Sequence, residues 1–383
     1  MSAERPNPVP ASSACGRCLR RSWLLSELSG PLDYCARDRE RLLELLALDD
    51  EELLDAVAGR RRAELRSRYE RFESFPKLSS DGETESICRH SADYPHALSG
   101  ACAPHMLELS TGASRFARLL ERPVVAILGS TGASDYGMEM ARSIARGLAA
   151  SEVNVVAARC DGIALAAHAG ALEAGASIAV VGGGLGVSYP ARHRPLYERV
   201  KRAGCAVSEL PDRASGRRWG GLAAERIVVE LADLTVLVEA EQTAAQLTGA
   251  RLAEALGRPL AAIPGRLTSP LSRGPHALLM QGASLIRGPE DALELLYRNG
   301  LGGQPRSAET NTPAIEQTRG LSVELQNIME RVGSGYDTPD KLTRAGIDPA
   351  DALLGLSELE LCGLLGRGDG GRYVLRRSLS LDR

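Results

Sequence analysis

The sequence lacks a long apolar run: no stretch of its 383 residues approaches the roughly 20 apolar residues that a membrane span needs. The first residues, MSAERP, also lack the charged-then-apolar order of a signal peptide. We therefore expect no membrane partner and a cytoplasmic location. Aromatic residues make up only 4% of the chain, but 44% of it is hydrophobic, which is enough for the cores of two or three globular domains.

A large excess of either charge is also missing. The chain has 46 Lys and Arg residues against 49 Asp and Glu residues, for a formal net charge of −3. This balance excludes a protein that is basic over its whole surface, as many obligate nucleic-acid binders are. A nucleic-acid site, if the chain has one, must therefore be local.

The eight cysteines do not form the even framework of a small secreted, disulfide-rich protein. Cys15 and Cys18 have the spacing of metal ligands, but no second pair of this kind follows. Cys35 alone does not complete a tetrahedral zinc site without a histidine. We interpret these cysteines as buried or idle thiols at a domain edge, in preference to a structural zinc site, and expect no metal and no cofactor.

Changes in sequence pattern divide the chain into four parts. Leucine at helical spacing among dense Arg and Glu predicts a small helical domain over residues 1–78. Residues 79–298 follow as the main domain. Gly, Pro, Thr and Asn without periodicity predict a linker over residues 299–320. A last domain then covers residues 321–383.

The main domain alternates short β-branched runs with segments of helical period, which predicts an α/β fold with a Rossmann-like, doubly wound and mostly parallel sheet. Most of these runs are continuously apolar, as expected of strands that are buried on both faces. The expected strands are residues 124–128, 153–158, 178–181, 205–208, 234–238 and 260–263. The expected helices include residues 137–150, 163–174 and 244–256, and residues 284–296 close the domain.

The last domain has three short amphipathic segments, residues 321–332, 338–345 and 349–361, followed by a glycine-rich turn within residues 367–375. Three helices and a hairpin predict a winged helix. The segment in the position of a recognition helix is acidic and has no Lys or Arg, so it is poorly suited to the major groove. We predict that this domain contacts proteins or regulates the chain.

Glycine-rich loops follow the first strands of the main domain. Gly129 and Ser130 end the first strand, and Gly162 follows the second. A loop of this kind before a helix places backbone N–H groups where a phosphate binds, although it also occurs as a plain tight turn. The glycine spacing differs from the dinucleotide fingerprint, and no acidic residue suited to a ribose stands in the expected place, so we expect no nicotinamide cofactor.

Positive charge gathers at the predicted carboxyl edge of the sheet, where open α/β sheets bind ligands. Arginines interleaved with an aromatic residue suit a groove for a nucleic-acid backbone with one base-stacking platform. The residues are Arg192, Arg194, Arg217, Arg218, Trp219 and Arg226. The alternative is a solvated helix face with an exposed tryptophan. Paired carboxylates, a nucleophile elbow and a P-loop are all missing from the sequence, so we do not expect an enzyme.

These segments together resemble the DNA-processing protein A family, also called Smf, in order and spacing. The matching strings are VAILGS at 125–130, GI at 162–163, AHAGALEAG at 167–175, GL at 184–185, YP at 189–190, VSELP at 207–211, VEA at 238–240, ARLA at 250–253, PG at 264–265, SRG at 272–274 and GA at 282–283. The likeness also includes CLRRSWLL at 18–25, CRH at 88–90, DYP at 93–95 and the terminal winged helix, so it covers nearly the whole chain.

The resemblance implies a binding protein that holds and protects single-stranded DNA, loads the RecA recombinase in natural transformation or repair, and forms a homodimer through the Rossmann-like domain. It implies a DNA pocket at the carboxyl edge of the sheet, where the charges also point. The predicted DNA-binding residues are Gly129, Ser130, Gly162, Arg192, Arg194, Arg217, Arg218, Trp219, Arg226, Arg251 and Arg273.

The sequence departs from the family pattern within this pocket. Thr131 stands where the family usually has Arg, and of the string Phe-Pro-x-Arg-Asn-Arg only the last residue, Arg226, is kept. Each lost donor weakens phosphate binding. Two hypotheses follow: the remaining arginines still bind DNA, or the chain is a diverged nucleotide-sensing module without DNA binding.

Overall fold

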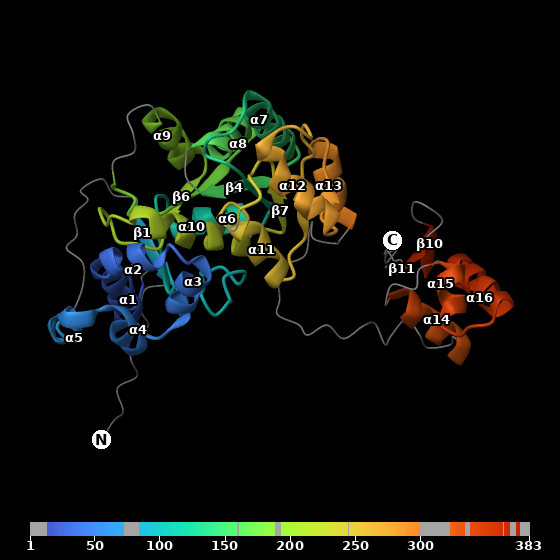
Figure 1. Cartoon of the computed structure of the whole chain (residues 1–383), viewed down its shortest axis with the longest axis horizontal. Helices are drawn as coiled ribbons and strands as arrows, with labels where there is room; N and C mark the ends of the chain where they lie inside the picture. Colours follow the sequence, from blue (N-terminus) through green and yellow to red (C-terminus); the bar gives the residue numbers. More distant parts are fainter. Residues whose placement is uncertain are drawn as a thin grey trace, which may run out of the picture. The chain divides into compact units, whose positions relative to one another are not determined.

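The computed structural model describes residues 14–72, 84–158, 161–187, 193–243, 245–298, 322–333, 338–362, 364–367 and 373–375. The chain divides into two compact units, Met1–Ser307 and Ala308–Arg383 (Figure 1). Within the described residues, no helix is both long enough and apolar enough to cross a membrane.

A single sheet of nine strands, counted over the described residues, forms the centre of the first unit. The strands are β1 (Glu85–Cys88), β2 (Met106–Leu109), β3 (Val124–Leu128), β4 (Asn154–Ala158), β5 (Ser177–Val181), β6 (Cys205–Ser208), β7 (Leu234–Leu237), β8 (Leu260–Ala262) and β9 (Ser284–Leu285). Their order is β1-β2-β6-β5-β4-β3-β7-β8-β9. β1 and β2 pair antiparallel at one edge, and every pairing from β6 to β9 is parallel.

Helices cover both faces of this sheet (Figure 1). α7 (Asp135–Ala150), α8 (Gly162–Ala174) and α13 (Pro289–Arg298) share one apolar core with the strands. α6 (Ala113–Leu120), α10 (Arg217–Leu231), α11 (Thr248–Ala255) and α12 (Arg273–Met280) share the core on the other face. α9 (Arg194–Ala203) lies between β5 and β6 in the chain. The central strands are buried along their whole length, which explains their continuously apolar sequence.

The order of the strands creates a switch point beside β3. The chain runs outward from β3 through β4, β5 and β6, then returns to place β7 on the other side of β3. The connections after β3 and β7 therefore leave in opposite directions, and a crevice opens at the carboxyl ends of these strands. Ligands of open α/β sheets bind at such a point.

A group of helices precedes the sheet: α1 (Gly16–Glu27), α2 (Ser29–Cys35), α3 (Arg39–Ala47), α4 (Asp50–Val57), the 3₁₀ turn η1 (Gly59–Arg61) and α5 (Arg62–Glu70). Arg21 is buried, donates to the carbonyl of Leu46 at 2.8 Å and pairs with Asp50 at 2.9 Å, which ties α1 to the start of α4. The leucines of these helices form one core with Leu210, Trp219 and Ala223 of the main domain. The N-terminal helices therefore pack directly on α10.

The second unit contains α14 (Val323–Gly333), α15 (Pro339–Arg344), α16 (Pro349–Leu361) and the antiparallel strands β10 (Leu365–Arg367) and β11 (Tyr373–Leu375). Ile328, Leu342 and Leu356 lie in its core. This order of elements is the one expected for a winged helix, and that assignment stays a prediction. α16 carries no basic residue and leaves Leu353, Leu354 and Leu361 exposed.

The predicted parallel α/β sheet is confirmed, and the six predicted strands agree with β3 to β8 within one residue at every end. β1 and β2 were missing from the prediction, which began the alternation of strands and helices only at residue 124. β9 is a two-residue strand within the predicted closing segment. The predicted domain boundaries themselves stay predictions.

Candidate nucleic-acid interface

A crevice of about 360 Å³ lies at the switch point of the sheet. It is formed by the loops after β3, β4 and β7, by the start of α10, and by the junction of α2 and α3. The lining residues are Ala36, Arg39, Ile127, Leu128, Gly129, Ser130, Thr131, Ala158, Asp161, Ala164, Arg218, Gly221, Leu222, Glu225, Ala245 and Gln246. Half of them are Gly, Ala, Ser or Thr, so the backbone is accessible to a ligand there.

A second hollow of about 600 Å³ shares Arg39 and Ala245 with the crevice. We call it the outer hollow; its lining residues are Arg37, Asp38, Arg39, Glu40, Leu43, Ala245, Thr248, Arg251, Leu252 and Ala255. Because two residues line both spaces, the crevice and the outer hollow are adjacent, and we call the two together the groove. The groove runs from the loop after β3 to α11.

Close approaches of backbone explain the glycines at the base of the groove. Gly162 starts α8 at a φ of +51°, and a Cβ atom there would lie 2.3 Å from the carbonyl oxygen of Ser130. A side chain at this position would push α8 away from the loop after β3. At the start of α10, a Cβ atom on Gly216 would lie 1.2 Å from the oxygen of Gly182, so α10 also rests directly on the neighbouring loop.

The N-terminus of α7 is occupied by a carboxylate of the chain itself. Glu239, buried after β7, accepts hydrogen bonds from the backbone N–H of Ser134 at 2.9 Å and from its hydroxyl at 2.6 Å. A carboxylate at this place stabilises the positive end of the helix. The phosphate site that the sequence suggested in the loop before this helix is therefore filled by Glu239.

The carboxylates that line the groove are also engaged. Glu225 accepts a hydrogen bond from the backbone N–H of Gly249 at 3.0 Å and lies 3.9 Å from the guanidinium of Arg39. Asp161, at the start of α8, pairs with His193 at 3.1 Å. Asp38 caps α3 by accepting from the backbone N–H of Arg41. With Glu40 of the outer hollow, the lining has four carboxylates, and Arg39 is the arginine that lies close to one of them.

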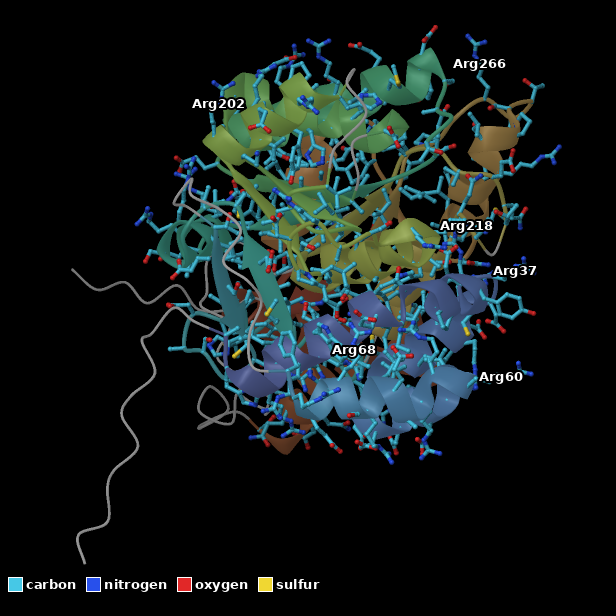
Figure 2. All side chains as sticks on the ribbon, turned by 90° about the vertical axis from the view of Figure 1, so that its left-hand side faces the viewer. Arg37, Arg60, Arg68, Arg202, Arg218 and Arg266 are labelled. Carbon is cyan, nitrogen blue, oxygen red and sulfur yellow. The ribbon has the colours of Figure 1, made fainter. Side chains whose placement is uncertain are left out.

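Four arginines reach the groove, and two of them were missing from the prediction. Arg218 lines the crevice with a side chain that is 78% exposed and 3.7 Å from Asp33, and Arg251 lines the outer hollow. Arg39 donates to the hydroxyl of Thr248 at 2.9 Å. Arg37 lies over the ring of Tyr34 at 4.9 Å. In Figure 2, Arg37 and Arg218 point outward at the same edge of the molecule.

Arg37 and Arg39 were missed because they belong to the N-terminal helices, which the sequence analysis treated as a separate domain. Their only sequence signal is the string Arg37-Asp-Arg39 at a helix junction. The packing of these helices on α10, which brings both arginines to the groove, depends on long-range contacts that periodicity does not reveal.

Two predicted DNA contacts are wrong. Trp219 is fully buried, and its indole N–H donates to the Ser29 hydroxyl at 2.9 Å, so its ring is not available to a base. Arg226 is also buried, pairs with Glu209 at 2.6 Å and donates to the carbonyls of Cys102 and Ala223. Burial lowers the pKa of Arg226, but the Glu209 carboxylate outweighs it and holds the pKa above its usual range. Both side chains therefore hold α10 to neighbouring parts of the fold: Trp219 to α2, and Arg226 to the segments that carry Cys102 and Glu209.

The other predicted residues lie in several places. The crevice is lined by Gly129, Ser130 and Arg218, and the outer hollow by Arg251. Gly162 packs against the backbone of the loop that carries Ser130. Three further arginines are exposed at helix starts but do not line the groove: Arg194, Arg217 and Arg273. Arg192 lies outside the described residues.

Comparison with known proteins identifies similar chains. The sequence profile of the DNA recombination-mediator protein A family matches residues 85–297. A putative DNA processing protein DprA of Mycobacterium tuberculosis is 35% identical over 255 residues, which cover 66% of this chain and 64% of that protein. Protein Smf of Escherichia coli is 33% identical over 262 residues, covering 68% of this chain and 70% of that protein.

Solved structures show the same fold. The DNA processing protein A of Streptococcus pneumoniae matches with a TM-score of 0.57 and 26% identity, covering 73% of this chain and 98% of that one. A structure of the Helicobacter pylori protein, described for its single-stranded DNA binding mode, matches with a TM-score of 0.50 and 24% identity, covering 56% of this chain and 96% of that one.

Proposed function

Because this chain belongs to the DNA recombination-mediator protein A family, we propose that it binds single-stranded DNA in the groove at the switch point of its sheet. The observation that carries this proposal is the pair of adjacent hollows lined by Arg37, Arg39, Arg218 and Arg251. An extended chain of phosphates needs cations in succession along a channel, and small residues beside them let the nucleic-acid backbone approach.

The N-terminal helices supply part of the positive charge that the family pattern places elsewhere. Thr131, at the position where the family usually has Arg, lines the crevice together with Arg39. We infer that Arg39 and Arg218 hold the phosphate that an arginine at position 131 would otherwise contact. The groove then depends on the docking of the N-terminal helices as much as on the sheet.

The four arginines of the groove set an upper limit on the ionic contribution to DNA binding. Each phosphate contact to a single strand contributes about −0.7 to the slope of the logarithm of the binding constant against the logarithm of the salt concentration. Four contacts therefore predict a slope of about −3. A slope this shallow fits the net charge of −3 and the local site.

The variant Arg218→Ala tests the location of the site. The side chain is mostly exposed, and the hydrogen bond from its backbone N–H to Asp33 at 2.7 Å does not depend on the side chain, so stability should change little. We expect single-strand affinity to fall about 3- to 10-fold and the salt slope to become shallower by about 0.7. Fluorescence anisotropy with a labelled oligothymidylate measures both quantities.

Arg202→Ala is the matched control. Arg202 is an exposed arginine of α9 that does not line the groove, and Figure 2 shows it away from Arg37 and Arg218. The Arg202→Ala variant removes the same charge as Arg218→Ala. Because Arg202 lies outside the groove, the variant should leave the single-strand affinity and the salt slope within error of the unaltered protein. Equal losses for the two variants would refute the groove as the site and leave only a general electrostatic attraction.

The resemblance supports two further proposals. We propose that the chain forms a homodimer through the unit that carries the sheet, and that it hands its single strand to the RecA recombinase. Leu267, between β8 and α12, and Met280, at the end of α12, are almost fully exposed, and we propose that they contribute to this contact. The acidic α16, with its exposed leucines, suits the predicted contact with a protein.

The alternative function, a nucleotide-sensing module without DNA binding, uses the same crevice, whose volume is within the range of small-molecule pockets. A free nucleotide that raises the melting temperature when oligonucleotides do not would favour this alternative.

A further inference from the structure

Four side chains with metal-binding atoms meet where the N-terminal helices join the sheet. Cys15 and Cys18 lie at the start of α1, Cys88 ends β1, and His90 follows two residues later. Their three sulfur atoms and one imidazole nitrogen all lie within 4.8 Å of one another. Cys18 and Cys88 are 70 positions apart in the chain, so the fold, and not local sequence, brings the cluster together.

The distances match the edges of a tetrahedron around a metal ion. The Nδ1 atom of His90 is 3.3 Å from the Sγ of Cys15, 3.4 Å from that of Cys18 and 4.0 Å from that of Cys88. For a zinc ion with its usual bond lengths to sulfur and nitrogen, the sulfur-to-nitrogen edge of the tetrahedron is about 3.5 Å.

Hydrogen bonding alone does not account for this arrangement. Nδ1 of an imidazole has either one proton or one lone pair, so it makes one good hydrogen bond and not three. All three cysteines of the cluster are free. Cys18 and Cys88 are buried, which also argues against three thiols that merely share a surface with a histidine.

The surroundings suit thiolates bound to a cation. The backbone N–H of Cys15 donates to the Sγ of Cys88 at 3.4 Å, and the hydroxyl of Ser91 lies 3.5 Å from the same sulfur. Outer contacts of this kind orient and stabilise metal-bound sulfur. The two cysteines of α1 lie at its N-terminus, where the helix dipole favours negative charge.

We propose that Cys15, Cys18, Cys88 and His90 bind one zinc ion in a closed structural site. Three thiolates and one imidazole are a zinc ligand set, whereas calcium and magnesium require oxygen ligands. Binding releases one proton from each of the three thiols, and the fourth position is filled by His90, so no site is left for a water or substrate. The ion would fasten α1 to β1 and so hold the N-terminal helices, with Arg37 and Arg39, on the main domain.

Cys15 and Cys18 have no second pair with the same spacing in the sequence. The partner motif is instead Cys88-x-His90, a shorter spacing within a segment already matched to the family. The proposed zinc site therefore replaces the interpretation of Cys15 and Cys18 as idle thiols.

The metal content of the full chain, purified without a histidine tag, tests the site directly. We expect about one zinc per chain by plasma mass spectrometry. Removal of the zinc and addition of cobalt should give the strong visible bands of tetrahedral cobalt together with a thiolate charge-transfer band. Less than a tenth of an equivalent of zinc with no cobalt bands, iron in place of zinc, or a disulfide between Cys15 and Cys18 would overturn the proposal.

Variants locate the ion within the chain. His90→Ala alters an exposed ligand, so the fold should survive, and zinc affinity should fall by at least about 100-fold, the upper end of the loss seen when outer-shell partners are removed. Cys18→Ser should lose the zinc and the cobalt bands. Cys35→Ser is the matched control, because Cys35 lies in the same group of helices but outside the cluster, and it should keep both. Full zinc content in His90→Ala and Cys18→Ser would refute the assignment.

Discussion

Replacement of Arg226 by Ala is expected to lower the free energy of unfolding by about 3–5 kcal/mol. The guanidinium is buried, pairs with Glu209 at 2.6 Å and satisfies the carbonyls of Cys102 and Ala223. Without it, the Glu209 carboxylate stays buried with no cation, and its Oε2 atom already has no hydrogen-bond partner among the described residues. Urea unfolding followed by circular dichroism measures the loss.

A double variant separates the buried charge from the lost packing. Arg226→Met together with Glu209→Leu removes both charges and keeps most of the volume, so it should recover much of the stability that Arg226→Ala loses. A direct role in DNA binding predicts the opposite pattern: a stable Arg226→Ala variant with a shallower salt slope. A stable Arg226→Ala variant with a shallower salt slope would show that Arg226 contacts DNA and would contradict its structural role.

Replacement of Trp219 by Ala is expected to lower the free energy of unfolding by about 3–5 kcal/mol, because a fully buried indole leaves a large cavity. Trp219 lies in the core that joins α10 to the leucines of the N-terminal helices, and its N–H donates to Ser29. The loss should therefore loosen the docking of these helices, which carry Arg37 and Arg39. Thermal unfolding gives the stability, and limited proteolysis of the N-terminal segment reports the docking.

Trp219→Leu distinguishes this packing role from the base-stacking role that the sequence suggested. Leucine keeps an apolar side chain in the core but has no aromatic face. A base that stacked on Trp219 would lose about 1–3 kcal/mol of binding energy with this change. We expect single-strand affinity of the folded variant, measured well below its melting temperature, to stay within about twofold, a difference smaller than 0.5 kcal/mol. A tenfold loss would show that the indole contacts DNA.

Sequence patterns were sufficient for the parallel strands β3 to β8 because the central strands are buried on both faces. A run such as residues 124–128 is apolar at every position for that reason, and the glycine loops after β3 and β4 follow from the same alternation. The carboxyl edge of the sheet, and therefore the place of the crevice, follows from this topology. Gly129, Ser130 and Arg218, which this reasoning placed at that edge, line the crevice, and their contact with DNA stays a prediction.

The direction of individual side chains on α10 was not predictable in this way. Arg217, Arg218, Trp219 and Arg226 share one helix, and sequence composition made all four candidates for the groove. Which of them face solvent depends on what covers the helix, and here the N-terminal helices cover Trp219, while Glu209 and Cys102 enclose Arg226. Contacts between the N-terminal helices and the main domain also bring Arg39 to the crevice and Cys18 to Cys88. The periodicity of the sequence indicates neither of these two approaches.

The groove is less positive than four arginines suggest, because carboxylates of the chain stabilise the loops around it. Glu239 holds the start of α7, and Glu225 holds the start of α11 while it approaches Arg39. Anions that the chain supplies itself occupy two helix N-termini that would otherwise favour phosphate. We therefore expect the affinity for DNA to depend on the exposed arginines and on the accessible backbone of the crevice.

Binding of the unaltered full-length protein to a fluorescent single-stranded oligonucleotide, with unlabelled duplex as competitor and across a salt series, tests the central claim most directly. We expect submicromolar affinity at low salt, preference for the single strand over the duplex, and a salt slope of about −3 from four phosphate contacts. No binding at low salt, or equal competition by the duplex, would contradict the groove as a site for single-stranded DNA.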